Sequence, residues 1–407
     1  MTVLPPSKLV LLGMMSRMPV AGNVWLILQY LIGLRRLGYD PYYVEAHGVY
    51  PGMLMGGSGG DAGDRVAGFL DRALRPFGFG DRWAIHDPDS GDCRGLSRTR
   101  LSELYRSAAL IVNVHGGTRP LPEQYATGRM VYLGTDPVQV EVELHDGRQE
   151  TIDFLAPHAA FFTWGENHGR PDCRVPVSDR FEFQPTRAPV VMDLWEPGDV
   201  APRPVFTTVG NWDQTRRGKD VTFEGEVYTW SKHHEFLKFL DLPGRTGQAF
   251  ELALSGGSYT DADRRLLEGR GWAVRDSLEF STELDAYRRY LAGSRGEFTV
   301  AKDQNVRLRS GWFSERSAQY LACGRPVVTQ ETGFSNVLPA GRGLFAFATP
   351  DEAAATVAEV NADYDRHRRA AREVAREFFS YDVVLPKLLA DAGVERRPRG
   401  AAVWPAG

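Results

Sequence analysis

The sequence predicts an α/β protein built from two domains, each with a parallel sheet covered by helices. The chain has 407 residues, which fits two domains of roughly 180 to 200 residues each. Residues 8–45 read as a strand, a helix and a strand, and such a βαβ unit implies parallel strands. A second series of strands and helices follows a proline-rich break that ends at residue 204. We therefore expect two Rossmann-like halves that face each other across a cleft.

The first domain is expected to begin with a strand at Lys8–Gly13, a helix at Asn23–Leu37 and a strand at Tyr42–Glu45. The helix contains the longest apolar run of the chain, Val24–Leu34, which is too short to span a bilayer and is typical of a buried helix. The Gly-rich segment 52–63 reads as a surface loop, with a lid over the cleft as the alternative. Further strands are expected at Ala109–Val114, Met130–Gly134 and Ala160–Trp164.

Five prolines between residues 184 and 204 mark the best linker candidate. We assign residues 1–195 to a first Rossmann-like domain and 203–375 to a second one. Residues 376–394 are expected to form a C-terminal helix that packs back toward the first domain, and 395–407 a disordered tail. The expected strands of the second domain are Val205–Gly210, Ala249–Leu254, Trp272–Arg275, Glu297–Val300, Pro326–Thr329 and Leu344–Phe347.

Composition narrows the class of protein. The chain is 43% hydrophobic and 25% charged, with a net charge of −4, so it is globular and shows no basic stripe for nucleic acid. Three separated cysteines without a CxxC pair argue against disulfides or a zinc site. With no signal-peptide layout, these features indicate a cytoplasmic protein without stable membrane insertion. Only six of the 48 cationic residues are Lys, a bias that suggests a GC-rich bacterial source.

The segment from Lys302 to Ser335 carries the strongest functional signal. Lys302 follows a strand, and Ser314 is placed to cap a helix whose first turn holds Glu315. After the next strand, a tight Thr332-Gly333 turn is expected to lead into another helix. Helix N-termini present free N–H groups, and a nearby Lys would neutralise a departing diphosphate. Glu315 would either accept hydrogen bonds from a sugar or ribose hydroxyl, or serve only the helix dipole.

The residues from Ser310 to Phe334, SGWFSERSAQYLACGRPVVTQETGF, resemble the donor-binding region of bacterial GT-B glycosyltransferases close to family four. Residues 19–25, 29–38, 42–45 and 163–167 resemble the first domain of the same group. The resemblance covers nearly the whole chain and implies sugar transfer from a nucleotide-diphosphate sugar. One departure is that Gly311 and Gln319 stand where family four has its Glu-x7-Glu pair, so Glu315, Arg316 or Glu331 would substitute.

The donor site is expected at the carboxyl ends of the second-domain strands. In the resembling enzymes, the loop at Gly210 faces the donor phosphates, and the nucleobase is expected near residues 272–281. Lys219 lies in a charged excursion and is expected to be solvated. The donor-binding candidates are Gly210, Asn211, Trp212, Lys302, Ser314, Glu315, Arg316, Ser317, Thr332, Gly333, Phe334 and Ser335.

Polar residues at the strand ends of the first domain are the candidates for acceptor chemistry. His115, Asp136 and Glu166 are the catalytic candidates, because each follows an expected strand and can exchange a proton with a hydroxyl. The sequence does not choose among them. The acceptor-side candidates are Gly22, Asn23, Glu45, His47 and Asn167.

No cofactor and no metal are expected. Asp261-Ala262-Asp263 matches a metal-binding DxD, but it follows Thr260 at a helix start, where capping explains both acids. Adjacent His233 and His234 do not share a helix face. The predicted function is glycosyl transfer to a hydroxyl or amine acceptor, such as a small natural product. The alternatives are a sugar-nucleotide epimerase on the same fold and a non-catalytic nucleotide-sugar binder, and a homodimer is the alternative to a monomer.

Overall fold

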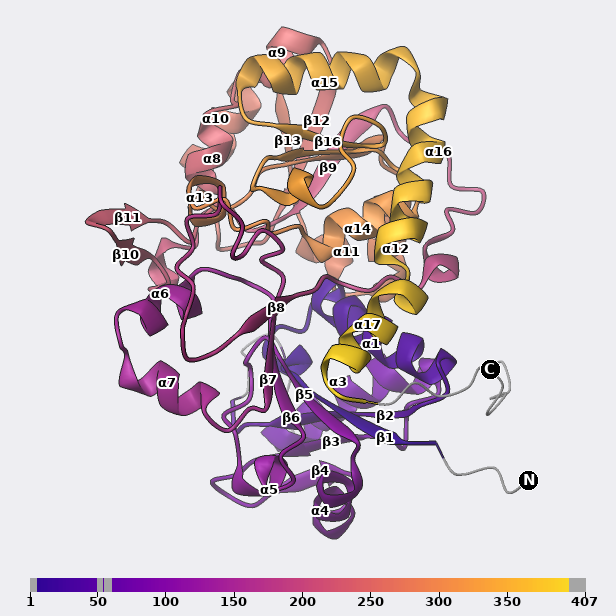
Figure 1. Cartoon of the computed structure of the whole chain (residues 1–407). Helices are drawn as coiled ribbons and strands as arrows, with labels where there is room; N and C mark the ends of the chain where they lie inside the picture. The colour runs from indigo at the N-terminus through magenta and orange to yellow at the C-terminus, as the bar shows by residue number, and fades with distance from the viewer. Residues whose placement is uncertain (1–5, 50–53, 55–60, 395–407) are drawn as a thin grey trace.

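The computed structural model describes residues 6–49, 54 and 61–394, and shows two α/β domains stacked end to end (Figure 1). Most of the expected loop 52–63 and the whole expected tail 395–407 lie outside the described residues. Each domain contains one large sheet, and the sheets are parallel except at one strand. The fold is GT-B, with two Rossmann-like domains, as the sequence predicts.

The first sheet has the strand order β4-β3-β2-β1-β5-β6-β7-β8. Only β4 runs antiparallel to its neighbour. The chain order reverses between β1 and β5, where Leu11 pairs with Val112, and such a switch point leaves a crevice at the carboxyl ends of the strands. The strands are β1 (Lys8–Leu12), β2 (Asp40–Ala46), β3 (Trp83–His86), β4 (Cys93–Gly95), β5 (Leu110–Val114), β6 (Met130–Gly134), β7 (Ala160–Thr163) and β8 (Phe183–Pro185).

The second sheet is fully parallel, with the order β13-β12-β9-β14-β15-β16. Parallel strands are buried on both faces, which explains their nearly continuous apolar sequences. The strands are β9 (Val205–Gly210), β12 (Ala249–Leu254), β13 (Trp272–Asp276), β14 (Gly296–Thr299), β15 (Val327–Gln330) and β16 (Leu344–Phe347). A small antiparallel hairpin, β10 (Val221–Phe223) with β11 (Glu226–Tyr228), follows β9.

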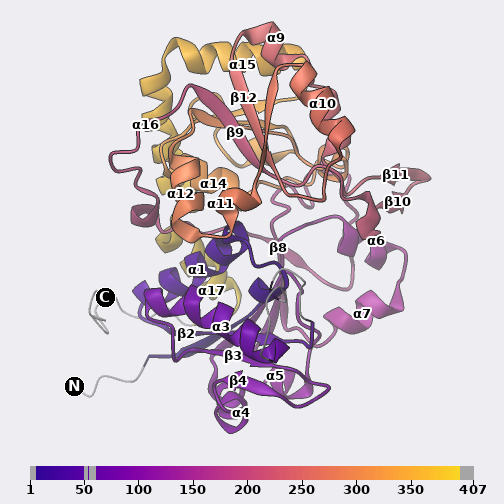
Figure 2. The same cartoon turned by 180° about the vertical axis from the view of Figure 1, so that it is seen from behind.

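Helices cover the sheets (Figures 1 and 2). In the first domain they are α1 (Ala21–Arg36), α3 (Ala62–Leu74), α4 (Arg98–Ser107), α5 (Pro122–Tyr125), α6 (Gln139–His145) and α7 (Gln149–Leu155). In the second they are α8 (His233–Leu237), α9 (Leu242–Thr246), α10 (Asp261–Gly269), α11 (Leu278–Ser281), α12 (Leu284–Ala292), α13 (Asp303–Arg307), α14 (Glu315–Ala322), α15 (Pro350–Ala362) and α16 (Tyr364–Val374). Beyond α16, a π-helical turn (Ala375–Phe379) leads into α17 (Tyr381–Asp391).

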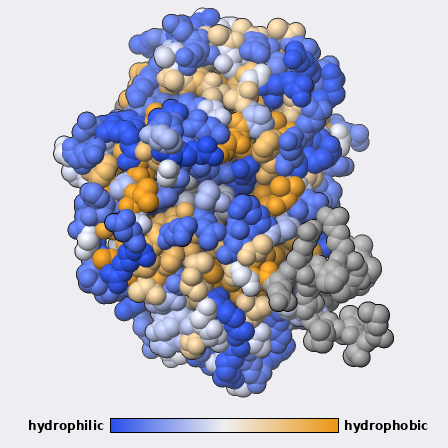
Figure 3. Space-filling model, in the orientation of Figure 1, coloured by the Kyte–Doolittle hydropathy of each residue, from blue (hydrophilic) through white to orange (hydrophobic). Residues whose placement is uncertain are grey.

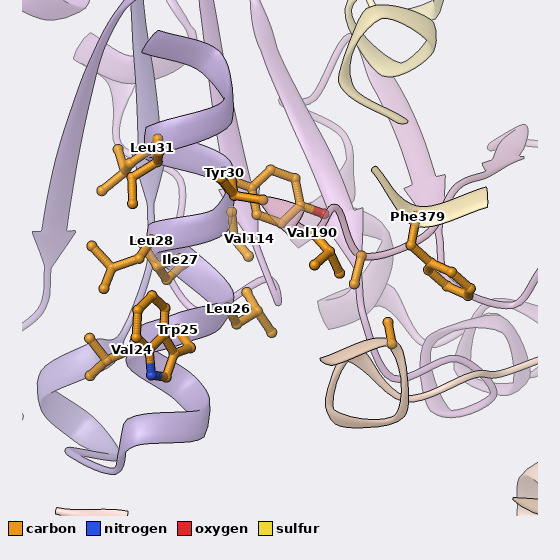
Figure 4. Packing of buried hydrophobic residues seen from close by; sticks show 14 of the residues in the cluster. Val24, Trp25, Leu26, Ile27, Leu28, Tyr30, Leu31, Val114, Val190 and Phe379 are labelled. Atoms are coloured by element: carbon orange, nitrogen blue, oxygen red, sulfur yellow. The ribbon is translucent and has the colours of Figure 1, made fainter. Parts of the chain in front are cut away.

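Helix α1 is buried nearly all round because it packs against β2, α12 and α17. Figure 4 shows its apolar side chains with Val114, Val190 and Phe379 nearby. Trp25 donates its indole N–H to the Leu284 carbonyl at 3.1 Å, a contact between the domains. Gly33 lets α17 approach, since a Cβ there would lie 2.7 Å from Leu385 Cδ1. The C-terminal helix therefore packs against the first domain, and a single apolar cluster spans both domains.

The expected linker is partly structured. Gln184 and Pro185 belong to β8, an edge strand that tolerates proline because one side carries no ladder bonds. Buried Trp195 is the last residue of a 3-10 turn (Met192–Trp195), and residues 196–204 remain as the connection to β9.

Among the described residues, no helix combines the length and the apolarity needed to cross a membrane. On the face shown in Figure 3, hydrophilic residues are interspersed with small hydrophobic areas.

Candidate functional site

The carboxyl ends of the two sheets point toward each other, and loops from both domains meet there. Trp312 donates its indole N–H to the Thr135 carbonyl at 3.1 Å, and Gln304 donates to the Pro137 carbonyl at 3.3 Å. Gly165 and Trp312 form an isolated antiparallel bridge. The loops after β6 and β7 therefore contact the loops after β14 directly. We call this region the interdomain site.

Lys302 lies at the centre of the interdomain site. It follows β14 as the N-cap residue of α13, and its ammonium donates to Asp136 Oδ2 of the other domain at 2.5 Å. The same ammonium lies 3.5 Å from the centre of the Trp230 ring, a cation–π contact. Burial lowers the pKa of Lys302, and the Asp136 carboxylate opposes that shift. A buried cation with one carboxylate partner is suited to exchange that partner for an anionic ligand.

Lys232 is a second buried cation, which the sequence analysis missed. It precedes α8, and its ammonium lies 5.3 Å from the Trp312 ring with no hydrogen-bond partner among the residues the structure describes. Burial, together with the nearby Arg316, lowers the pKa of Lys232 to about 7. The scarcity of Lys was the signal that could have found it.

Lys219 also reaches this region, against expectation. Its ammonium lies 4.7 Å from the Trp230 ring, and the side chain is half-buried rather than solvated. The hairpin β10–β11 causes this, because it packs against α6 of the first domain and turns residues 219 and 230 inward. Three of the six lysines thus join Arg316 in a cationic cluster: Lys219, Lys232, Lys302 and Arg316.

Arg316 lies in the first turn of α14, where Ser314 caps the helix as predicted by accepting from the Arg316 N–H at 3.2 Å. Its guanidinium donates to buried Glu297 at 2.6 Å and to the Val209 carbonyl at 2.5 Å. Glu297 helps to raise the pKa of Arg316 against the effect of burial. Arg316 is therefore anchored within the second domain, while half-buried Glu315 and buried Ser317 flank it.

The loop after β9 divides into two parts. Gly210 and Asn211 are half-buried, and the guanidinium of Arg316 is the group nearest to Gly210. Trp212 instead packs into the core of the second domain, with its ring stacked 5.8 Å from Phe236. Only the first two residues of the predicted Gly210-Asn211-Trp212 loop therefore border the cationic cluster.

The turn after β15 differs from the expected helix start. Phe334 begins a 3-10 turn of three residues instead of an α-helix, and Gly333 before it adopts a left-handed conformation. Thr332 and Phe334 are buried, and Ser335 is exposed. A Cβ on Gly333 would lie 2.5 Å from Asn167 Nδ2, so this turn packs against the first domain. It forms part of the domain contact and offers no second helix N-terminus to a diphosphate.

His115 and Asp136 come together at the ends of β5 and β6. His115 has a positive φ of 63°, and its Nδ1 hydrogen-bonds to the Thr135 hydroxyl. Its Nε2 and the Oδ1 of Asp136 are buried without a protein partner. Burial lowers the pKa of His115 to about 4, so the imidazole is neutral near pH 7. A strained, neutral histidine with a free ring nitrogen is able to hydrogen-bond a substrate hydroxyl.

Glu166 and Asn167 lie in structural contacts. Arg187 binds the buried Glu166 carboxylate, whose pKa is raised by burial, an effect that Arg187 opposes. Asn167 donates its side-chain amide to the Arg309 carbonyl at 2.8 Å and accepts from Asn336 at 2.8 Å. Glu166 is thus paired with an arginine of its own domain, whereas Asp136 is paired with Lys302 of the other domain, and Asn167 joins the domains.

The remaining acceptor-side residues shape the loop after β1. Glu45 is fully buried and accepts hydrogen bonds from the Ser16 amide and hydroxyl and from the Tyr43 hydroxyl. His47 accepts from the Val49 amide at Nδ1, so Nε2 carries a proton and donates to Glu45 at 2.8 Å.

Asn23 holds the same loop by donating to the Met18 carbonyl at 3.1 Å. Gly22 faces Tyr287 of the second domain, whose hydroxyl lies 3.5 Å from where a Cβ would stand. The polar side chains of the acceptor-side candidates therefore mainly hold the loop backbone in place, and few of them remain free to bind a ligand.

The DxD motif has the structural role that the sequence predicts. Thr260 and Asp263 form a reciprocal capping box at the start of α10, with the Thr260 amide donating to Asp263 at 2.8 Å. Within residues 6–49, 54 and 61–394, no group of three or more metal-binding side chains gathers.

Comparisons with known proteins agree with the two-domain fold. Residues 233–390 match the family model described as "Glycosyl transferase-like". A glycosyltransferase from Rickettsia africae superimposes with a TM-score of 0.54 at 10% identity, covering 96% of this chain and 98% of that one. Curated protein sequences give no significant match.

Two further structures have similar folds. An α-glucosyltransferase in complex with UDP-glucose and DNA gives a TM-score of 0.57 at 10% identity, covering 95% of this chain and 99% of that one. Anabaena HepE in complex with UDP and glucose gives 0.55 at 11% identity, with the same coverage. The family match covers residues 233–390, and the structural similarities show the GT-B fold over nearly the whole chain.

Proposed function

We propose that the protein transfers a sugar from a nucleoside-diphosphate sugar to a hydroxyl or amine of a small acceptor. One observation carries the proposal: buried Lys302 bridges the two domains by binding Asp136 at 2.5 Å, beside a second buried lysine. A diphosphate is the donor feature that such a cluster fits, because two or more cations neutralise its developing charge as the glycosidic bond breaks. The structurally similar proteins described with UDP or UDP-glucose support this donor class.

The cluster is assembled from several elements of the second domain. Lys302 follows β14, Lys232 precedes α8 and Arg316 begins α14. Arg316 has Glu297 as its counterion and Lys302 has Asp136, whereas Lys232 has no acidic partner among the described residues. The cluster therefore holds unbalanced positive charge where the strand ends meet, and these side chains supply the charge stabilisation that a metal ion provides elsewhere.

On the opposite side of the site, His115 is proposed to orient the transferred sugar or the acceptor through its free Nε2. Asp136 lies beside it, since its charge acts on the pKa of His115. When a diphosphate takes over Lys302, the Asp136 carboxylate becomes available to accept the proton of the attacking hydroxyl. Glu166 stays bound to Arg187 and is not assigned that step.

The family-four likeness remains a proposal, and its acidic pair is replaced here. Gln319 is buried and accepts a hydrogen bond from Tyr287 at 3.3 Å, and Gly311 packs against Asn167. Neither position presents a carboxylate to a donor. Glu315, half-buried beside the cationic cluster, is the substitute that the geometry favours.

The acceptor is proposed to be a small molecule. One structurally similar protein is described with DNA, but the net charge of −4 gives this chain little general attraction for a phosphate backbone.

The test is titration calorimetry with a panel of nucleoside diphosphates, followed by turnover assays with the matching sugar donors. Lys302→Met should weaken binding at least 10-fold, because a charge-assisted bond contributes about 1.5–3 kcal/mol. Lys387→Met is the matched control, since that lysine is exposed on α17 and pairs only with Asp391. Equal affinity of Lys302→Met and wild type for every nucleotide would exclude the proposed donor site.

Incubation with donor alone separates the alternatives. An epimerase would form a new sugar isomer without any acceptor. A binder that has lost its chemistry would hold the nucleotide sugar and leave it intact in the presence of acceptors.

A further inference from the structure

The described part of the chain has a pocket of about 420 Å³ on α16, on the side of the second domain where the chain crosses between domains. Its walls include Pro197 of the interdomain connection, Gly324 at the end of α14, and α16 with the π-helical turn that follows it. The pocket is therefore bordered by Pro197 of the interdomain connection and by α16, which with the π-helical turn leads back to the first domain. None of the residues assigned to the donor or acceptor lines it.

Four arginines line the pocket: Arg368, Arg369, Arg372 and Arg376. Arg368, Arg372 and Arg376 follow one another at intervals of four, which puts like charges on one helix face and destabilises the helix unless a counterion is present. Only two acids line the same pocket, Asp365 and Glu373.

The acids do not balance the arginines. Glu373 pairs with Arg342 at 3.2 Å, outside the pocket lining. Arg372 binds Glu196 of the connection at 2.6 Å, and Arg368 lies 3.5 Å from Asp365. Arg369 and Arg376 have no ion-pair or hydrogen-bond partner among the described residues. Two guanidiniums at the pocket thus lack a protein counterion.

A buried guanidinium next to the pocket adds to the positive charge. Arg325 follows Gly324 and is fully buried, with one bond to the Ala292 carbonyl at 2.7 Å and one to the Val200 carbonyl at 3.2 Å. Its Nη1 and the Nε of Arg368 are buried without a partner. Burial lowers the pKa of Arg325, and the nearby Arg368 adds to that effect. Arg325 does not line the pocket, and Arg369 and Arg376 are exposed, so the excess of arginines over acids in the lining is what favours an anion there.

We propose that this arginine pocket binds a phosphate-bearing small molecule with at least two negative charges. Guanidinium forks match phosphate oxygens in a bidentate geometry, and a concave basic surface concentrates anions. A volume of about 420 Å³ accommodates a molecule as large as a sugar phosphate or a nucleotide. The bound anion would contact the hinge between the two domains.

The test is titration of the full chain with inorganic pyrophosphate, in a Lys302→Met background that removes the proposed donor site. The background protein should still bind one pyrophosphate. Arg369→Gln combined with Arg376→Gln should weaken this binding at least 10-fold. The control combines Arg265→Gln with Arg366→Gln, which removes the same charge from two exposed arginines outside the pocket.

Three outcomes would each overturn the proposal. Pyrophosphate binding could be lost in Lys302→Met alone, it could be retained in the Arg369→Gln and Arg376→Gln variant, or it could be weakened equally in the control. Circular dichroism and thermal melts establish that the variants fold. Vesicles of phosphatidylglycerol distinguish the source of the phosphate: sedimentation that depends on Arg369 and Arg376 identifies a lipid headgroup, and pyrophosphate binding without sedimentation identifies a free phosphate compound.

Discussion

Lys302 and Asp136 form an ion pair of 2.5 Å across the boundary between the two domains. Each residue lies in the loop after a parallel strand, β14 for the lysine and β6 for the aspartate, and the two strands belong to different sheets. The pair joins the proposed donor side to the proposed acceptor side. A diphosphate that binds Lys302 would compete with a carboxylate of this chain for the same ammonium.

Replacing Asp136 with asparagine should increase the affinity for a nucleoside diphosphate severalfold, because the ligand no longer competes with an internal anion. Turnover should fall, since the proposed proton acceptor is lost. Calorimetry and an initial-rate assay measure the two effects separately. Asp391→Asn is the control, because that carboxylate pairs with Lys387 on the surface of α17. Weaker nucleotide binding by Asp136→Asn would contradict the competition.

Lys232 should make donor binding depend on pH. Its ammonium loses its proton as pH rises through about 7, so nucleotide affinity should fall between pH 7 and 9. Lys232→Arg, which stays charged, should retain affinity at pH 9, and Lys232→Met should show weak binding with little pH dependence. A wild-type affinity that is constant over this range would exclude Lys232 from the site.

Lys232 should also make the free energy of unfolding depend on pH. Its pKa is about 7 in the folded chain and 10.5 in its ordinary state, so between these values the unfolded chain binds more protons. The free energy of unfolding should therefore rise with pH across this window because of Lys232. Denaturant unfolding at pH 7 and 9 gives the change in the free energy of unfolding with pH for wild type and for Lys232→Met. The difference between these two changes is the contribution of Lys232. An identical pH dependence in the two proteins would refute it.

Arg316→Met should destabilise the second domain by about 3–5 kcal/mol, because Glu297 is left buried without its counterion. Combining Arg316→Met with Glu297→Met should recover most of that loss. Urea unfolding of the single and double variants tests this. If Arg316→Met keeps its stability and loses only nucleotide affinity, then Arg316 is primarily a donor ligand.

Gly311→Ala should destabilise the contact between the domains. Gly311 has φ +80°, and a Cβ there would lie 2.2 Å from the Asn167 amide nitrogen. Gly147→Ala is the matched control, because Gly147 has φ +69° and a Cβ there would have no atom within 4 Å. This substitution should lower the free energy of unfolding only by the cost of a left-handed alanine, about 1–2 kcal/mol. Thermal unfolding should show a larger loss for Gly311→Ala, and small-angle scattering a larger radius of gyration. Equal losses in the two variants would mean that the contact at Asn167 is not tight.

Much of the fold follows from local patterns. The strands at Val205–Gly210, Ala249–Leu254 and Leu344–Phe347 lie where the sequence predicts them, because buried parallel strands read as short apolar runs between turns. The caps at Ser314 and Thr349 were also predictable, since a capping side chain bonds within its own helix. The hairpin β10–β11 was not predicted, because its short strands are stabilised by packing against α6.

For the proposed site, the sequence by itself determined local features: strand ends, a lysine after β14 and a capped helix beside it. Only the tertiary structure decided which side chains remain free to bind. Arg316 pairs with buried Glu297, and Glu166 pairs with half-buried Arg187. The partners are about 20 residues apart in sequence, so these pairings leave no local pattern. Lys232 acquires its lowered pKa from burial against residues far along the chain. The charge of a side chain and its spacing from its neighbours can be read from the local sequence. Its burial and its ion-pair partners depend on how distant segments pack together.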